Sequence, residues 1–181
     1  MRARQPVPTI WLMTDERADA TLESALRRLP RGAGIVFRHY TLARAERRRR
    51  FEQVRSIARA RKLVLVLAGG RRDAIGWRAD GWHSGTPHLS PMRTRLRTAP
   101  AHTLRESFAA RRVDSDLVFV SPVFETRSHP GARSLGPLRF GQIATASGTI
   151  VIALGGMTAR RHRRLVELGA AGWAAIDAWS A

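Results

Sequence analysis

The chain has 181 residues, of which 44% are hydrophobic, and this length and composition suit one globular domain with a sizeable core. It has no cysteine, which excludes disulfide bonds and cysteine-ligated zinc or iron–sulfur sites, and no apolar run approaches the roughly 18 residues that a membrane helix needs. The basic N-terminus is interrupted by Pro6 and Pro8 and does not resemble a secretory signal. We therefore expect one cytoplasmic domain over residues 1–181, without a membrane segment.

The net charge is +18, from 32 Lys and Arg residues against 14 Asp and Glu. Such an excess favours nucleic-acid binding in general, because neutralising phosphates drives non-specific affinity. Lys62 is the only lysine, however, and a bias toward arginine with many alanines and glycines is typical of a GC-rich genome. The run Arg47–Arg50 falls in a predicted basic helix, where such runs usually form a solvated face. We therefore expect no nucleic-acid partner and keep a nucleic-acid-binding helix over 44–62 as a third hypothesis.

Short apolar runs recur along the whole chain, and each is typical of a β-strand. Continuous runs such as Leu63–Leu67 suit parallel strands that are buried on both faces. The predicted strands cover residues 9–13, 34–38, 63–67, 81–83, 96–99, 117–121, 149–154 and 172–176.

Helical patterns lie between these strands. Thr103 and Glu106 have the spacing of a capping box at the start of one helix, and Thr158 can cap another. No helical pattern follows the last strand, because the chain ends five residues after it. The predicted helices cover residues 18–29, 43–61, 72–77, a segment from 103 onward, 137–146 and 158–168.

This alternation of strands and helices predicts a parallel sheet with right-handed crossovers. A (β/α)₈ TIM barrel is the simplest closure of eight strands, whereas the competing doubly wound open sheet more often has five or six. With 181 residues the barrel would be shorter than the roughly 250 residues typical of the fold. We therefore predict a compact (β/α)₈ TIM barrel that lacks the last helix.

In such barrels the chemistry lies at the carboxyl ends of the strands. Each polar or glycine residue there also has a structural explanation: Asp15 can cap a helix, isolated histidines are usually just hydrogen-bonded, and Gly155-Gly156 can form a turn. Together they predict one polar face, with backbone N–H groups near Gly155 that could approach a phosphate. The residues at this face are Asp15, Arg38, Gly69, His83, His102, Thr126, Ser128, Gly155, Gly156 and Asp177.

Several segments of this face are similar to the thiamine phosphate synthase/TenI family. The more specific ones are VSPVFETRSHP at 120–130 and IALGGMT at 152–158, and GAAG follows at 169–172. Upstream, WLMTD, IVFR, ADGWH and AHT occur in the family's order, so that the resemblance covers essentially the whole chain. It implies a (β/α)₈ barrel and a role in thiamine biosynthesis. Family members join an aminopyrimidine pyrophosphate to a thiazole phosphate with Mg²⁺, or tautomerise the thiazole.

The resemblance also implies roles for individual residues. Arg38 matches a family arginine that holds pyrophosphate, and two hydroxyl residues match a Thr-x-Thr-Lys loop. If catalysis is retained, Arg38 would hold an anionic group while His129 or His102 moves protons, with His83 and His88 near the rim. The implied substrate- and phosphate-binding residues are Arg38, Thr126, Ser128, Gly155 and Gly156.

Other family positions are substituted. The magnesium-binding aspartates correspond to Gly69 and His88, and the pyrophosphate-binding lysine corresponds to Tyr40. A hard cation with few oxygen ligands is bound weakly, so we assign no metal site. Without Mg²⁺ and lysine, the charge on a departing pyrophosphate would lose its main stabilisers, which argues against the standard synthase reaction. Further substitutions are Pro100 and Asp177 for family serines, His129 for the loop lysine, and Pro122 for the TenI histidine.

We therefore predict a divergent thiamine phosphate synthase/TenI-like protein, and the sequence leaves open whether it is a transferase. The alternative is a non-catalytic binding or regulatory barrel for a thiamine-related ligand. In either case the expected partner is a small-molecule phosphate ester or thiamine precursor. A homodimer also stays open, since the absence of an eighth helix would leave apolar area exposed near Trp173 and Trp179.

Overall fold

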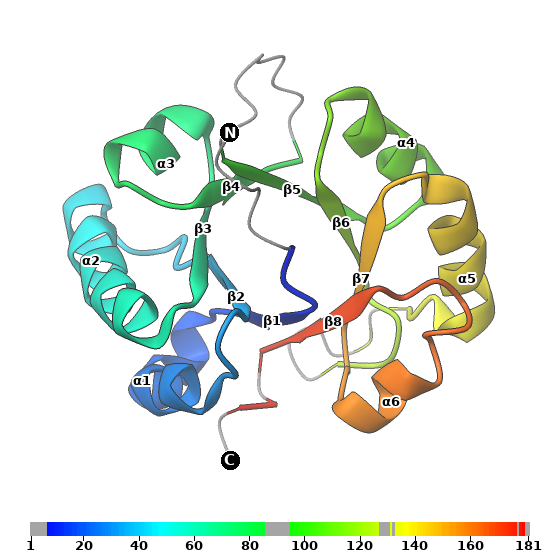
Figure 1. Ribbon diagram of the computed structural model, residues 1–181, viewed down its shortest axis with the longest axis horizontal. Helices are drawn as coiled ribbons and strands as arrows, with labels where there is room; N and C mark the ends of the chain where they lie inside the picture. The colour runs from blue at the N-terminus through cyan, green and yellow to red at the C-terminus, as the bar shows by residue number, and fades with distance from the viewer. Residues whose placement is uncertain (1–6, 86–94, 127–130, 132, 177, 180–181) are drawn as a thin grey trace.

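Eight parallel strands close into a barrel in which β1 pairs with both β2 and β8 (Figure 1). The computed structural model describes residues 7–85, 95–126, 131, 133–176 and 178–179. The predicted TIM barrel is confirmed, the open sheet is excluded, and every predicted strand occurs within two residues of its expected bounds. The strands are β1 Ile10–Met13, β2 Gly34–Phe37, β3 Val64–Ala68, β4 Gly81–His83, β5 Leu96–Ala101, β6 Leu117–Val120, β7 Ile150–Leu154 and β8 Gly172–Ala175.

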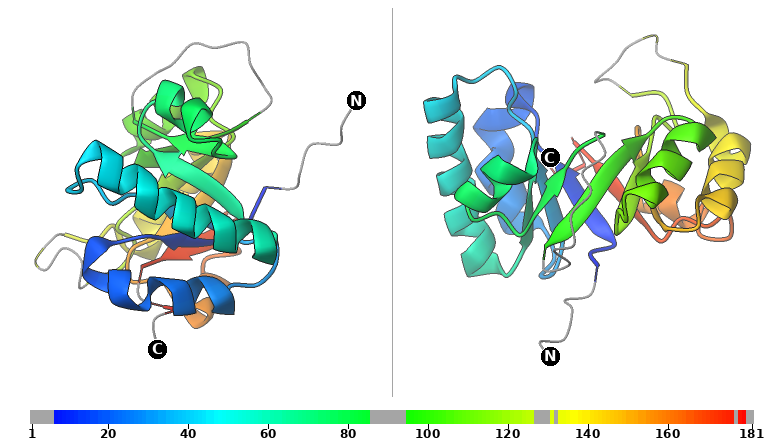
Figure 2. Two further views of the ribbon diagram at one scale, coloured as in Figure 1. Left: turned by 90° about the vertical axis from the view of Figure 1, so that its left-hand side faces the viewer. Right: turned by 90° about the horizontal axis from the view of Figure 1, so that it is seen from above.

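The helices surround the barrel on the outside (Figures 1 and 2). The helix predicted over 158–168 is shorter than expected, because α6 ends at Arg163 and the chain continues in tighter turns, such as the one in which Leu168 N–H donates to the Leu165 carbonyl at 3.0 Å. The other predicted helices are confirmed. Their bounds are α1 Asp19–Arg28, preceded by the 3₁₀ turn η1 Glu16–Ala18, then α2 Arg44–Arg61, α3 Arg71–Gly76, α4 Leu104–Arg112, α5 Gly136–Ser147 and α6 Ala159–Arg163.

The barrel interior is filled by apolar side chains from alternate positions of the strands. Trp11 is fully buried there, and its ring meets Phe119 edge-on with ring centroids 5.2 Å apart. A closed interior of this kind makes the lower barrel a packed core, so that open space for a ligand is confined to the strand ends. The interior cluster consists of Trp11, Met13, Val36, Val66, Ala68, Leu117, Phe119, Ile152 and Ala174.

The outer face of β8 is covered without an eighth helix in the described part of the chain. The Trp179 ring stacks on Trp173 with centroids 5.3 Å apart, and the Trp179 carbonyl accepts a hydrogen bond from Arg28 of α1 at 3.4 Å. Trp173 is only 5% exposed, so the expectation of exposed apolar area around it is wrong. The reason is that the Trp179 ring packs against Trp173 at the outer face of β8. Among the described helices, none is long and apolar enough to cross a membrane.

The arginine run of α2 is not a uniformly solvated face. Arg47 donates hydrogen bonds to the carbonyls of Arg38 and Ala68, and Arg50 pairs with Asp19 of α1 at 2.9 Å. Only the two arginines between them are exposed. Half of this run therefore holds α2 against its neighbours, which weakens the case for a nucleic-acid-binding surface.

Candidate active site

A cavity of about 720 Å³ lies at the carboxyl ends of the strands. Apolar side chains that include Met13 and Phe119 line it together with a small number of polar groups, the usual composition of a ligand site. Six predicted residues are brought together there: Arg38, His83, His102, Thr126, Gly155 and Gly156. Four further predicted positions, His88, Ser128, His129 and Asp177, lie outside the described residues.

Arg38 follows β2, and two neighbouring residues that follow β1 hold its guanidinium. Its Nε donates to the Thr14 carbonyl at 2.6 Å, and its Nη2 donates to the Asp15 carboxylate at 3.1 Å. Asp15 is shared with Arg17, whose Nε and Nη2 donate to it at 2.8 and 2.9 Å. The Arg17 hydrogen bonds, with the charge of Arg38, lower the pKa of Asp15 to about 2. One carboxylate thus faces two guanidinium groups, and a net positive charge remains beside the cavity.

A buried histidine supports Arg38 from behind, and the sequence analysis did not single it out. His39 is 2% exposed, with its Nδ1 3.0 Å from the Thr14 hydroxyl and its Nε2 2.9 Å from the Asp19 carboxylate. The Thr14 hydroxyl also accepts the backbone N–H of Arg38 at 2.9 Å. Because the Asp19 carboxylate can only accept, the neutral imidazole carries its proton on Nε2, and Nδ1 accepts the proton of the Thr14 hydroxyl.

The Thr14–His39–Asp19 line resembles a nucleophile–base–acid triad in its order but cannot act as one. Thr14 is 1% exposed and does not line the cavity, so that its hydroxyl cannot reach a substrate. The line therefore positions Arg38. A histidine next to a strand-end arginine was the only sequence signal for this role, and it is a weak one.

Tyr40, at the family lysine position, has an arginine above its ring. The Arg47 guanidinium lies 5.4 Å from the Tyr40 ring centroid, while its Nη2 donates to the carbonyls of Arg38 at 2.6 Å and Ala68 at 2.7 Å. A positive charge therefore remains near the substituted lysine. Its hydrogen bonds tie the ends of β2 and β3 together.

His83, at the end of β4, is a neutral polar group in the cavity wall. Its Nδ1 lies 2.9 Å from the Thr98 hydroxyl, and its ring meets Phe119 edge-on at 5.4 Å. Burial, and secondarily the charge of Arg38, lowers the pKa of His83 to about 4. At neutral pH the imidazole is therefore uncharged and can form a hydrogen bond with a ligand.

His102 lies at the rim, after β5, and is more exposed. Both its backbone N–H and its Nδ1 face the Glu106 carboxylate, at 2.6 and 3.0 Å. Thr103 caps α4 by accepting the Glu106 N–H at 3.2 Å, as predicted. The structure thus places His102 in the cavity wall and gives its ring an acidic partner.

Gly155 and Gly156 allow the loop after β7 to pack against the loop after β6. They have φ values of +96° and +60°, and a Cβ on Gly155 would lie 2.7 Å from Pro122 Cα. A Cβ on Gly156 would lie 2.4 Å from the Glu125 carbonyl oxygen. Within the described residues, the backbone N–H groups of 155–157 have no hydrogen-bond acceptor. These N–H groups are therefore available to a ligand at the cavity wall.

Arg161 of α6 also lines the cavity, and the sequence analysis missed it. Its Nη1 donates to the Gly156 carbonyl, and its guanidinium lies 4.7 Å from the Phe124 ring centroid. The signal that could have found it is Thr158, whose hydroxyl caps the helix and accepts the Arg161 N–H at 3.2 Å.

The residues described at the strand ends do not fit a magnesium site. No group of three or more His, Asp or Glu residues in the described ranges could hold a metal ion. At the end of β3, where the family places a magnesium ligand, a side chain on Gly69 would have its Cβ 4.0 Å from Arg47 Nη1. A guanidinium at that position repels a divalent cation, and the donor set there has no carboxylate.

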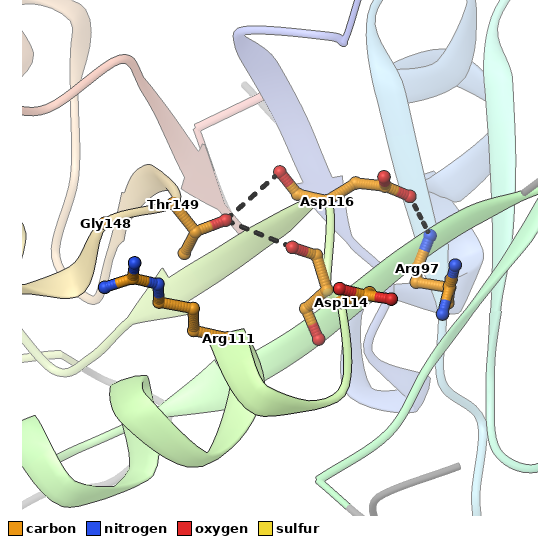
Figure 3. Close-up of a pocket in the computed structure, with 7 residues that line it drawn as sticks. Arg97, Arg111, Asp114, Asp116, Gly148 and Thr149 are labelled. Atoms are coloured by element: carbon orange, nitrogen blue, oxygen red, sulfur yellow. Dashed lines mark hydrogen bonds between the residues drawn. The ribbon is translucent and has the colours of Figure 1, made fainter. Parts of the chain in front are cut away.

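A smaller cavity of about 230 Å³ lies at the opposite end of the barrel (Figure 3). The Asp116 carboxylate accepts the Arg97 backbone N–H at 2.8 Å, and the Thr149 hydroxyl donates to the Ser115 carbonyl at 3.1 Å. These contacts join the start of β5 to the turns that precede β6 and β7. This end of a TIM barrel contributes to stability, whereas catalytic sites lie at the carboxyl ends. The larger cavity is therefore the candidate active site.

Comparisons with known proteins agree with this geometry. A family model described as thiamine monophosphate synthase matches residues 10–179. A putative thiamine-phosphate synthase 2 of Aquifex aeolicus is 27% identical, over 94% of this chain and 97% of that protein. A thiamine-phosphate synthase of Chlorobium luteolum is 28% identical, over 94% of this chain and 84% of that protein.

A solved structure supports the same fold. Thiamine phosphate pyrophosphorylase from Pyrococcus furiosus superposes with a TM-score of 0.75 at 22% identity, over 93% of this chain and 85% of that one. At this level of identity the likeness concerns the barrel alone. Since the family model spans nearly the whole barrel, from β1 to the tryptophan that stacks behind β8, the chain belongs to the thiamine monophosphate synthase family.

Proposed function

We propose that this protein is a transferase of thiamine biosynthesis that joins an aminopyrimidine pyrophosphate to a thiazole phosphate. The observation that supports this best is the fixed guanidinium of Arg38 in the wall of a largely apolar cavity at the strand ends. An apolar wall suits the two ring systems, and a preorganised cation suits the anionic group that one of them carries. Membership of the family gives the substrate class.

Arg38 would bind the pyrophosphate and stabilise the negative charge that develops as it departs. Because Asp15 and Thr14 already hold the guanidinium, little reorganisation is needed when that charge appears. Thr126 and the N–H groups at Gly155 and Gly156 would bind the phosphate of the second substrate. His102, or His129 in place of the family's loop lysine, would move protons, and neutral His83 offers another hydrogen-bonding group in the cavity wall.

Turnover of both substrates tests this proposal. Purified protein is incubated with aminopyrimidine pyrophosphate, thiazole phosphate and Mg²⁺, and thiamine phosphate is measured by chromatography. We expect product from the wild type and a loss of about 100-fold or more in Arg38→Gln, since a charge-assisted contact to the departing group is removed. Arg48→Gln, an exposed arginine of α2, is the matched control and should keep wild-type activity. No product at high enzyme concentration removes the synthase function.

A binding barrel without turnover is the second candidate. The observation that favours it is the end of β3, where Gly69 offers no carboxylate and Arg47 takes the nearby space. Calorimetry with thiazole phosphate, aminopyrimidine and thiamine distinguishes the two candidates. Saturable binding of one ligand by a protein that forms no product supports the binding barrel, whereas any turnover excludes it.

We also infer a cytoplasmic location, and we expect no nucleic-acid partner because Arg47 and Arg50 are engaged within the fold. Affinity for RNA or DNA that rises steeply at low salt would contradict this expectation. A homodimer stays a prediction, which size-exclusion chromatography with light scattering checks directly.

A further inference from the structure

The first turn of α6 presents one arginine to the cavity and leaves its neighbours outside. The Thr158 hydroxyl caps the helix by accepting the Arg161 N–H at 3.2 Å, which fixes the backbone at this point. Arg161 is among the side chains that line the cavity, whereas Arg160 and Arg163 of the same helix are not. Arg161 therefore lines the cavity because of its position in the helical turn, and not because this helix is rich in arginine.

Two contacts hold the Arg161 side chain at the cavity wall. Nη1 donates to the Gly156 carbonyl, and the guanidinium lies 4.7 Å from the Phe124 ring centroid. A guanidinium has five N–H donors, and Arg161 gives one of them to an acceptor among the described residues. Arg161 is exposed and takes part in none of the ion pairs among the described residues, although Glu125 lines the same cavity. Its charge is therefore available to an anion.

Backbone donors lie beside this guanidinium. The N–H groups of residues 155–157 have no acceptor within the described ranges, and Gly156 is close enough that a Cβ there would sit 3.1 Å from Arg161 Nη1. Backbone N–H groups together with a planar guanidinium suit the geometry of a phosphate. Two independent kinds of donor thus converge on one part of the wall.

This group of donors and Arg38 lie on different parts of the cavity wall. Arg38 follows β2 and Arg161 follows β7, and the closed strand order places β8 and β1 between them. Apolar side chains such as Met13, Leu154 and Ile176 also line the cavity. The cavity therefore has two cationic ends around apolar walls, an arrangement that suits two anionic groups carried by ring compounds.

We propose that Arg161 is a phosphate-binding residue, which holds the phosphate monoester of the thiazole substrate together with the N–H groups of residues 155–157. Arg38 then holds the other anionic group. Arg161 takes this role on a chain in which the family's loop lysine is replaced by His129. The geometry supports an anion-binding site, and the identity of its ligand, a thiazole phosphate, rests on the proposed function.

The test compares a phosphorylated ligand with the same ligand lacking phosphate. Calorimetry is performed with thiazole phosphate, the corresponding thiazole alcohol and inorganic phosphate, on the wild type, Arg161→Gln and Arg160→Gln. We expect Arg161→Gln to weaken binding of thiazole phosphate by about 10-fold or more and to leave the alcohol within about twofold. Arg160→Gln should match the wild type for all three ligands, and equal melting temperatures exclude a folding defect.

The outcomes separate this inference from the proposed function. If Arg161→Gln weakens the binding of thiazole phosphate and of the thiazole alcohol equally, or weakens neither, the inference is overturned. The synthase function is tested separately, by the turnover assay. If the wild type binds inorganic phosphate but not thiazole phosphate, and Arg161→Gln no longer binds inorganic phosphate, the phosphate site is supported and the thiazole is excluded as its ligand. Wild type that binds none of the three ligands overturns both.

Discussion

The two sides of the cavity are built in different ways. On the β1–β2 side, a network of side chains holds Arg38: the Thr14 hydroxyl accepts its backbone N–H, the Asp15 carboxylate accepts its guanidinium, and the buried imidazole of His39 bonds to the Thr14 hydroxyl. On the β6–β7 side, the backbone sets the geometry, because Gly155 and Gly156 adopt positive φ values that bring two loops into contact.

This difference determines how each side responds to substitution. A side-chain network fails by leaving a buried polar group without a partner, a cost that spreads to every member of the network. A glycine-dependent loop fails by steric overlap, which is local and has no conservative replacement. We therefore expect the β6–β7 side to be the more sensitive to a single added methyl group.

Gly155→Ala should have the largest effect. Its φ of +96° is unfavourable for alanine, and the new Cβ would lie 2.7 Å from Pro122 Cα, so that the two loops must separate. We expect the free energy of unfolding to fall by about 3 kcal/mol, measured by urea denaturation.

Gly32→Ala is the matched control for this change. Gly32 has a φ of +81°, but no heavy atom lies within 4 Å of the position that a Cβ would take, so that this variant tests backbone strain alone. We expect a loss of about 1 kcal/mol. Equal losses for the two variants would show that the loop contact at Gly155 contributes nothing.

His39→Leu should come next, with a loss of about 2 kcal/mol in the free energy of unfolding, because the buried Thr14 hydroxyl loses the acceptor for its proton. Since Arg38 also loses support, we expect the affinity for inorganic pyrophosphate to fall by about fivefold in calorimetry. His39→Asn, which tolerates the φ of +35°, should recover part of the stability. Arg48→Gln, an exposed arginine of α2, is the control, and a pyrophosphate affinity unchanged in His39→Leu would remove the positioning role of His39.

The titration of His83, which lies between the two sides of the cavity, should have a smaller effect on the free energy of unfolding. The folded-state pKa of His83 is about 4, below its ordinary value of 6.5, so that the unfolded chain binds a proton there which the folded protein does not. Its contribution to stability is therefore complete above about pH 6.5 and is lost as the pH falls toward 4. We expect this loss to be about 1–2 kcal/mol, because the imidazole is only partly shielded from solvent.

His83→Phe removes this titration and keeps an aromatic ring against Phe119. The slope of unfolding free energy against pH between 4 and 6.5 should therefore be flatter in the variant than in the wild type. A variant with the wild-type slope would assign the pH dependence to other groups.

Removal of divalent metal should have the smallest effect on anion binding. Since the described strand ends have no carboxylate cluster and Arg47 lies beside Gly69, Arg38 should bind inorganic pyrophosphate without help from a metal. We expect the dissociation constant to change by less than about twofold when Mg²⁺ is replaced by EDTA. A tenfold weakening in EDTA would show that residues beyond the described ranges supply metal ligands.

The barrel could be predicted from the sequence, because the signals for its strands and helices are local. Apolar runs such as Val64–Ala68 and caps such as Thr103 and Thr158 depend on neighbouring residues, and the structure confirms the elements that they predict. The exception, the shorter α6, also has a local cause in the tight turns after Arg163. Family motifs similarly placed Arg38, Gly155 and Gly156 at one face.

The charges around the cavity, by contrast, depend on contacts that form when the barrel closes. Contacts between residues that are distant in the sequence place three of the charged or titratable side chains. His39 bonds to Asp19, Arg47 donates to the Ala68 carbonyl, and the Arg161 guanidinium lies over the Phe124 ring. A run of arginines does not reveal which of its members point inward, because that depends on the partners each meets after the barrel closes. The periodicity of the chain specifies the strands, whereas the contacts between strand ends specify the site.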